Sequence, residues 1–250
     1  MKSYDGDGYI SRYLIHWTGK NKDTGVDDNE EGARILSAIA SERRLRFSAN
    51  PVYRRDCFTE IHDKMICFTD VPTHLSATHC TKYGQFGIAL HKLPMMNMGA
   101  QPVFYTTHVW KRELDTIFDF LQKQSINCTL EPRLFSSLMH HFYFFQHFST
   151  GCASSADTCY YEREWRLGSH GLPLADELNR DNGKWRCIQE GYSRYINKEI
   201  GTRVVVGDCE YFAFQNKVVA FLVAPAAWRQ KVRNPHGFDM HTYEDLVLGQ

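Results

Sequence analysis

The sequence predicts an α+β fold in which helices flank a split, mostly antiparallel β-sheet core. Three observations favour this class: strand-like runs lie near both ends of the chain, helical spacing lies between them, and the composition is that of a packed protein. Of the 250 residues, 43% are hydrophobic and 14% are aromatic, which excludes a wholly disordered or fibrous chain. Because no repeat or Pro/Ser-rich linker is visible, we expect residues 1–250 to form a single domain.

The first half of the chain begins with a strand and a helix. Residues 12–18 are rich in β-branched and aromatic side chains and stop at Gly19, which is typical of a strand. Residues 33–45 have apolar side chains at nearly helical spacing and end in basic residues, which favours a helix. Further strands are expected over residues 65–69, 86–91 and 103–107, with a short helix over residues 73–82.

The second half predicts more helix and then a closing group of strands. Residues 111–124 and 133–148 have the length and period of helices, and residues 160–167 those of a strand. Short helices are expected over residues 173–178 and 190–198. An antiparallel group is expected over residues 203–206, 209–215 and 218–223, with a tight turn at residues 216–217.

Positive and negative charges balance, with 29 Lys and Arg residues against 29 Asp and Glu residues. No whole-molecule field therefore favours nucleic acid or an anionic membrane, and any site for a polyanion must be a local patch. The polar N-terminus does not resemble a secretory signal, and the longest apolar run, residues 218–228, is too short to span a bilayer. We expect a cytoplasmic protein with no membrane partner.

Neither the cysteines nor the histidines have the spacing of a metal site. The eight Cys residues include no Cys-x-x-Cys pair and are most simply reduced, buried thiols. His140 and His147 lie two turns apart on the predicted helix, beside His141, but no Cys or carboxylate is spaced to complete a ligand set. We therefore expect no bound metal.

Two short patterns place reactive side chains together. In the first predicted strand, His16 and Thr18 lie two residues apart and so on the same side, next to Gly19, which lets a ligand approach the backbone. In the later strand, Glu162 and Glu164 likewise lie on one face, where like charges repel unless a cation or a hydrogen-bonding substrate faces them. The alternative is that these carboxylates only pair with neighbouring arginines.

Two arginine clusters, Arg43-Arg44-Arg46 and Arg54-Arg55, make the only dense positive patch in the N-terminal half. In most proteins such clusters are ordinary solvated charge. Guanidinium groups also bind phosphates through paired hydrogen bonds, so a pyrophosphate or a nucleic-acid strand is the other interpretation.

Five sequence blocks occur in order: His16-Trp17-Thr18-Gly19, residues 66–72 (ICFTDVP), His79 with residues 83–90 (YGQFGIAL), residues 102–105 (PVFY) and residues 162–166 (EREWR). Together these blocks, which cover residues 12–167, resemble the AbiGi family of phage abortive-infection proteins. That family is labelled an antitoxin from its neighbourhood with a toxin gene, and it resembles the ADP-ribosyltransferase fold. The DarT enzymes, more distantly similar, share an early-strand His and a late-strand Glu. Residues 168–250 carry no motif, and we expect them to complete or extend the same domain.

The resemblance implies two catalytic carboxylates. Glu164 matches the late-strand glutamate that binds the ribose 2′-hydroxyl and faces the developing cation. Glu162 occupies the position that assists the incoming nucleophile in arginine-directed transferases.

The resemblance also implies an NAD site. His16 and Thr18 match a His-x-Thr that anchors NAD, and Tyr83 and Phe86 resemble an aromatic wall that stacks on nicotinamide. The expected NAD-binding residues are His16, Thr18, Gly19, Thr69, Tyr83 and Phe86.

The expected function is that of an NAD-dependent ADP-ribosyltransferase of an anti-phage or toxin–antitoxin system, with NAD as co-substrate. No acceptor signature is recognisable, and RNA or single-stranded DNA held by Arg54 and Arg55 is the expected acceptor. A cognate toxin or antitoxin is a further expected partner. The alternatives are a catalytically inactive antitoxin or regulatory module that keeps the fold, and a plain NAD-hydrolysing toxin.

Overall fold

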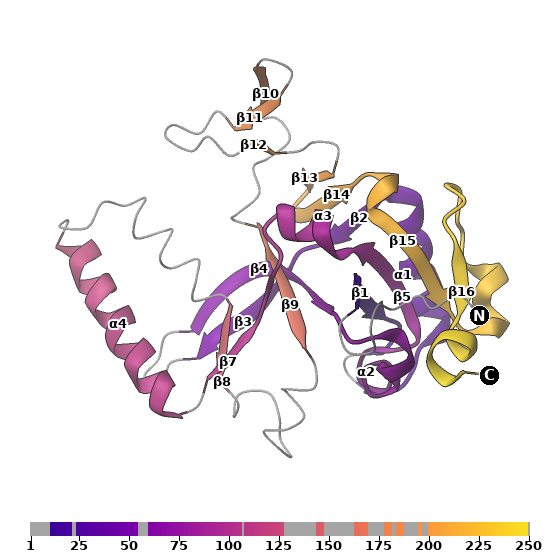
Figure 1. Ribbon diagram of the computed structural model, residues 1–250, viewed down its shortest axis with the longest axis horizontal. Helices are drawn as coiled ribbons and strands as arrows, with labels where there is room; N and C mark the ends of the chain where they lie inside the picture. Colours follow the sequence, from indigo (N-terminus) through magenta and orange to yellow (C-terminus); the bar gives the residue numbers. More distant parts are fainter. Residues whose placement is uncertain are drawn as a thin grey trace.

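The chain folds as a mixed α/β protein built on one large, mainly antiparallel sheet (Figure 1). The computed structural model describes residues 11–21, 24–54, 60–106, 108–127, 144–147, 163–169, 178–181, 184–187, 195–196 and 200–249. Glu162, Arg55, His140 and His141 lie outside these residues. No helix among the described residues is long and apolar enough to cross a membrane.

The large sheet has eight strands. Seven follow the order β16 (Met240–Thr242), β15 (Val219–Ala224), β5 (Phe86–His91), β1 (Tyr13–Thr18), β4 (Glu60–Thr69), β9 (Glu164–Gly168), β6 (Gln101–Pro102). The eighth, β3 (Ser48–Arg54), pairs with the first half of β4. Neighbours are antiparallel except for β15 and β16, which run parallel.

Three small sheets surround the large one. They are β10 (Leu178–Asp181) with β11 (Lys184–Cys187) and β12 (Tyr195–Ile196); β13 (Gly201–Val206) with β14 (Cys209–Phe214) and β2 (Arg44–Arg46); and β7 (Phe104–Thr106) with β8 (Phe145–His147). The β13-β14-β2 sheet is joined to the large sheet by β3, which follows β2 after one residue.

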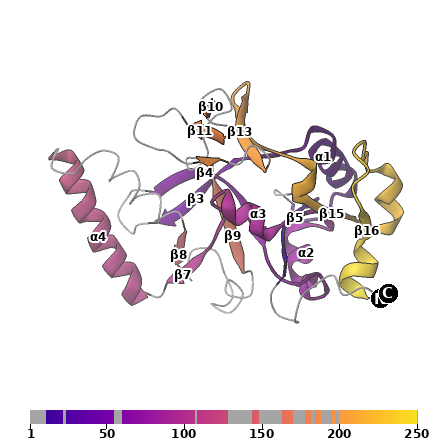
Figure 2. The same cartoon turned by 45° about the horizontal axis from the view of Figure 1, so that its top comes forward.

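The α-helices among the described residues are α1 (Asn29–Glu42), α2 (Ala77–Tyr83), α3 (Lys92–Asn97) and α4 (His108–Ile126). Short turns of 3₁₀- or π-helix cover Thr73–Leu75, Asn216–Val218, Ala226–Lys231 and Glu244–Leu248. Figures 1 and 2 both show α4 lying apart from the other three helices, at the far end of the long β3–β4 pair.

The two faces of the large sheet contribute to two hydrophobic clusters. On one face, Leu14 and Leu222 pack in a cluster that includes the buried side of α1. On the other face, Ile15 and Phe221 pack with Cys80 of α2 and with the C-terminal π-helix. Consecutive residues of a strand point to opposite faces, so β1 alone supplies both clusters.

Capping explains where α1 begins and ends. The Asp28 side chain accepts a hydrogen bond from the Glu31 amide (3.0 Å), which satisfies one of the unpaired donors of the first turn. At the other end, Arg43 adopts a left-handed conformation with φ of 53°, and its amide donates to the Ile39 carbonyl.

Several predicted elements are confirmed. Residues 12–18 and 86–91 form β1 and β5, and residues 111–124 lie within α4. Residues 203–206 and 209–215 form the β13–β14 hairpin.

Other predicted elements are wrong in part. The helix predicted over residues 33–45 ends at Glu42, because Leu45 lies opposite Phe212 in a strand pair between β2 and β14. Residues 218–223 do not pair with β14 across a tight turn; β15 joins the large sheet beside β5. The helices predicted over residues 133–148 and 190–198 contain the strands β8 and β12, and their remaining residues other than Phe144 lie outside the described ones.

Candidate functional site

The ladder between β1 and β4 is interrupted next to the predicted catalytic strand. Thr69 pairs with Glu164 on one side and with Ile15 on the other, and Met65 pairs with Gly168 and with Ser48. β1 and β3 therefore share the side of β4 that faces away from β9. Residues 66–68 pair with β9 on one side. On the other side, neither the β1–β4 ladder nor the β3–β4 ladder includes them, so the sheet is split at this point.

His16 lies in this break. Its Nδ1 is 2.9 Å from the carbonyl oxygen of Cys67, and its ring meets Phe68 edge to face with centroids 6.0 Å apart. A carbonyl only accepts, so Nδ1 carries the proton and donates. The imidazole thus donates to the β4 backbone in the break, and the His16 side chain is half-buried where the strands separate.

Glu164 is held by Arg166, its neighbour on the same face of β9. Arg166 Nε lies 2.8 Å from Oε1 and a terminal nitrogen lies 3.2 Å from Oε2, which makes a bidentate pair. Only 14% of the Glu164 side chain and 6% of the Arg166 side chain are exposed. Burial, and then the negative charge of Glu164, raise the pKa of the Cys67 thiol well above its usual value.

Thr69 joins this strand pair to α2. Its hydroxyl oxygen lies 3.3 Å from Nε2 of His79 and accepts a hydrogen bond from the Val71 amide. Thr69 and His79 are both buried, whereas Tyr83 at the end of α2 is 39% exposed, with its ring centroid 6.4 Å from that of His79. The Thr69 hydroxyl thus adjoins the Glu164 strand, the His79 imidazole contacts that hydroxyl, and the exposed ring of Tyr83 lies next to the imidazole.

A buried ionic cluster that sequence reasoning missed lies beside Glu164. Asp70 pairs with Lys92 (2.6 Å) and with Arg163 (2.8 Å), and only 6% of its side chain is exposed. The Lys92 ammonium also lies 4.5 Å from the ring centroid of Trp165. The sequence feature that could have indicated this cluster is Asp70 itself, a charged residue immediately after the apolar run of residues 65–69.

Glu164 and His16 do not lie side by side on one sheet face. Glu164 and Thr69 are direct partners, and Cys67, two residues before Thr69 on β4, lies on the same face. His16 points to the other face, next to Phe68, and reaches β4 only through the break. Thr18 follows His16 on that same face of β1.

Gly19 and Phe86 have packing roles. Phe86 is fully buried, and a Cβ on Gly19, whose φ is 103°, would lie 2.8 Å from its ring. With no exposed ring surface, Phe86 does not fit the expected nicotinamide wall, and we correct its assignment to the core. Gly19 is needed where β1 ends against this ring and against Gly32 of α1.

The geometry assumed for the second glutamate also needs correction. The strand predicted over residues 160–167 begins only at Glu164, and Arg163 before it is left-handed with φ of 44°. Strand alternation therefore does not extend through Arg163 to place Glu162 on the face of Glu164. Glu162 itself lies outside the described residues.

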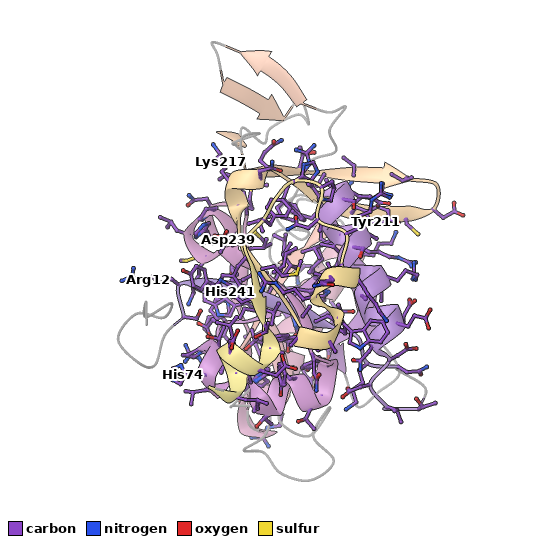
Figure 3. The ribbon with its side chains drawn as sticks, turned by 90° about the vertical axis from the view of Figure 1, so that its right-hand side faces the viewer. Arg12, His74, Tyr211, Lys217, Asp239 and His241 are labelled. Carbon is purple, nitrogen blue, oxygen red and sulfur yellow. The ribbon has the colours of Figure 1, made fainter. Side chains whose placement is uncertain are left out.

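The two arginine clusters are not one patch. Arg44 pairs with Glu42 (2.6 Å) and stacks on Tyr211, with 4.3 Å from the guanidinium carbon to the ring centroid. Arg54 is the last residue of the seven-residue strand β3, which places it about 20 Å from Ser48 at the other end of that strand, next to β2. Tyr211 and His74, which lies just before α2, are far apart in Figure 3, so the Arg44 surface is remote from the Thr69–His79 contact.

Metal ligands and cysteine pairs do not add to this site. Within the described part of the chain, no group of three or more His, Cys, Asp or Glu side chains is arranged to hold a metal ion. Cys67, Cys80 and Cys209, the cysteines whose side chains the structure describes, form no disulfide.

Comparison with known proteins identifies the family. Residues 33–200 match the model of a family described as "Putative abortive phage resistance protein AbiGi, antitoxin". The search of curated proteins and the search of solved structures gave no match. The matched range contains Thr69, Tyr83 and Glu164, whereas His16 precedes it. Since this range is more than half of the 250 residues, the chain belongs to the AbiGi family.

Proposed function

We propose that this AbiGi protein is an NAD-dependent ADP-ribosyltransferase of an abortive-infection system, with Glu164 as its catalytic carboxylate. The observation that carries the proposal is the position of Glu164, directly opposite Thr69 and one strand away from the break occupied by His16. The carboxylate of Glu164 and the hydroxyl of Thr69 share one face of the antiparallel sheet, and the imidazole of His16 lies in the discontinuity beside them on the other face. We infer an ADP-ribosyltransferase-like fold from that split.

The proposed reaction breaks the bond between nicotinamide and its ribose. The bonding electron pair leaves with nicotinamide, positive charge develops on the ribose, and a nucleophile of the acceptor bonds to the same carbon and releases a proton. A carboxylate fixed beside that carbon stabilises the charge in the transition state more than in the bound substrate. In this proposal Arg166 fixes the orientation of the Glu164 carboxylate through both of its oxygens.

The remaining residues are proposed to bind the co-substrate and the acceptor. His16 and Thr18 on β1, Thr69 on β4 and the exposed ring of Tyr83 are the proposed NAD contacts. Gly19 and Phe86 support them from the core. Glu162 is proposed to assist the nucleophile, and Arg54 and Arg55 to hold an RNA or single-stranded DNA acceptor.

The test is incorporation of label from NAD. Purified protein is incubated with NAD labelled in its adenylate part and, separately, with RNA, single-stranded DNA and a bacterial protein extract. We expect label in a nucleic-acid pool together with release of nicotinamide. Label confined to polypeptides would contradict the proposed acceptor, and the absence of both label and nicotinamide would contradict the proposed activity.

A second function, that of a non-catalytic antitoxin which binds a cognate toxin, has its own support. The family description names an antitoxin, and Glu164 is already engaged in a nearly buried ion pair of the kind that also serves structure alone. Neutralisation of the co-expressed toxin by Glu164→Asp as fully as by the wild type, with no nicotinamide release from either, would favour this function.

A further inference from the structure

We propose that Asp70 is a positioning residue which, through Arg163, fixes the start of β9 and with it the carboxylate of Glu164. The inference rests on the proposed function for its catalytic consequence, but its structural part concerns only contacts between β4, β9 and α3. Nothing in the family description assigns a role to Asp70, Arg163 or Lys92.

The contacts form a chain that leads to Glu164. Thr69 and Glu164 are the last register pair of the β4–β9 ladder. Asp70 and Arg163, the next residue along each strand, are joined by a backbone hydrogen bond of 3.4 Å and by the ion pair of 2.8 Å between Arg163 Nε and Asp70 Oδ1. The ladder is therefore extended by one residue through side chains, directly before the catalytic position.

The conformation of Arg163 explains why such a clamp is needed. Its φ of 44° is in the left-handed region, which costs a non-glycine residue about 1 kcal/mol or more. Without the contact to Asp70 that holds this conformation, the Arg163 backbone relaxes toward an extended or right-handed state. Glu164 is the next residue, so such a relaxation moves its carboxylate relative to Thr69 and Arg166.

Lys92 fixes Asp70 in turn. Its ammonium is 2.6 Å from Oδ2 of Asp70, so each carboxylate oxygen has one cationic partner. Lys92 is the first residue of α3 and also lies over the ring of Trp165, the residue after Glu164. Lys92 of α3 thus holds Asp70, and Asp70 in turn holds Arg163 at the start of β9. Glu164 lies between Arg163 and Trp165, the two residues that Asp70 and Lys92 contact.

Substitutions separate the effect of the Arg163 backbone conformation on catalysis from the effect of the Asp70 charge. In Asp70→Asn we expect kcat for nicotinamide release to fall about 10- to 100-fold while KM for NAD changes less than about threefold, because a small misplacement of a catalytic group impairs mainly the chemical step. Glycine adopts positive φ without strain. Asp70→Asn combined with Arg163→Gly should therefore regain most of kcat, whereas Asp70→Asn combined with Arg163→Ala should not.

Hydrogen exchange measures the same clamp without any activity. Amides at the start of β9 should exchange faster in Asp70→Asn than in the wild type, and Arg163→Gly but not Arg163→Ala should restore their protection. If the wild type releases no nicotinamide, the proposed function fails while this measurement still tests the clamp.

Glu210 supplies the matched control, since it is another largely buried carboxylate with two cationic neighbours, Lys64 at 2.7 Å and Arg203 at 3.8 Å. Glu210→Gln should leave kcat unchanged and should not make the amides at the start of β9 exchange faster than those of the rest of the large sheet. Equal behaviour of the Gly and Ala double variants, or an equal loss in Glu210→Gln, would overturn the proposal.

Discussion

The carboxylates of Asp70, Glu164 and Glu210 each have cationic partners, but their surroundings give them different consequences. Asp70 and Glu164 are nearly buried beside the break in the sheet. Glu210 lies on β14, where Lys64 of β4 and Arg203 of β13 meet it, and 45% of the Lys64 side chain is exposed. Asp70 and Glu164 therefore bear on the proposed chemistry. Glu210 instead helps to attach the β13-β14-β2 sheet to the large sheet.

Glu210 should make stability depend on pH in the acid range. Burial opposes its ionisation, but the Lys64 hydrogen bond and the charges of Lys64 and Arg203 outweigh burial and lower the pKa of Glu210. Its stabilising contribution is therefore present above the unfolded-state pKa of about 4.3 and is lost as the pH falls through the lower folded-state value.

Chemical unfolding of Glu210→Gln at several pH values measures this contribution. The variant should be less stable than the wild type near pH 7, and the difference should shrink below about pH 4. A difference that stays constant with pH would contradict the assigned cause.

At the scale of elements, the contact of α1 with β5 depends on a glycine. A Cβ on Gly32 would lie 2.4 Å from Cδ2 of the fully buried Phe86 and 2.9 Å from the Cα of Gly19. Alanine is better than glycine inside a helix by about 1 kcal/mol, but overpacking of a core costs about 1–3 kcal/mol. Neither the buried Phe86 ring nor the backbone of Gly19 can move away easily. The cost of overpacking should therefore exceed the gain in helix propensity, and Gly32→Ala should destabilise the protein.

Thermal unfolding of Gly32→Ala should therefore show a lower Tm than the wild type. Combining it with Phe86→Leu should recover part of the loss, because the smaller side chain leaves room for the methyl group. A rise in Tm for Gly32→Ala alone would show that the close packing of α1 on β5 is not as described.

The β3–β4 pair carries the proposed acceptor contacts. If Arg54 and Arg55 hold a phosphate backbone, Arg54→Ala with Arg55→Ala should reduce labelling of RNA or single-stranded DNA and leave NAD hydrolysis unchanged. The slope of log affinity against log salt should flatten by about 0.7 for each lost contact to a single strand.

Arg44→Ala is the control for these two arginines, because its guanidinium is already paired with Glu42 and stacked on Tyr211. It should leave the salt slope near that of the wild type. Normal labelling by the Arg54 and Arg55 double variant at near-physiological salt would exclude this acceptor site.

Local pattern predicted the strands that are short, apolar and bounded by glycine, such as β1 and β5. It failed where pairing between distant segments decided the outcome. Leu45 satisfies helical spacing, yet it is buried opposite Phe212, more than 160 residues away along the chain. A left-handed Arg43 ends α1 in a way that no propensity indicates.

The candidate site was predictable in the same uneven way. The sequence blocks pointed to His16, Thr69 and Glu164 as candidates, but the pairing of Thr69 with Glu164 and the Asp70 clamp require knowing that β4 and β9 are neighbours. Arg166 was within reach of the sequence, since it lies two residues after Glu164 on the same strand face. The burial of Phe86 was not, because its partners are two glycines from other elements.

At the scale of the whole molecule, the family match and the sheet do not have the same boundaries. The match covers residues 33–200, while β1, β15 and β16 of the large sheet lie before and after it. Both sides of the break next to Glu164 are therefore needed to form the candidate site, and only the β4 side falls within the matched range. We infer that the proposed activity requires the segment before that range, which contains β1 and His16.

The central claim, that Glu164 acts in chemistry as well as in an ion pair, is tested most directly by nicotinamide release from NAD in the wild type and in Glu164→Asp. Aspartate keeps the charge that Arg166 requires but withdraws the carboxylate, so folding measured by circular dichroism should persist while the rate falls about 100-fold or more. Glu164→Gln should be equally inactive but also less stable, because it leaves Arg166 buried without a counter-charge. Undiminished release by Glu164→Asp, or no release by the wild type, would contradict the claim.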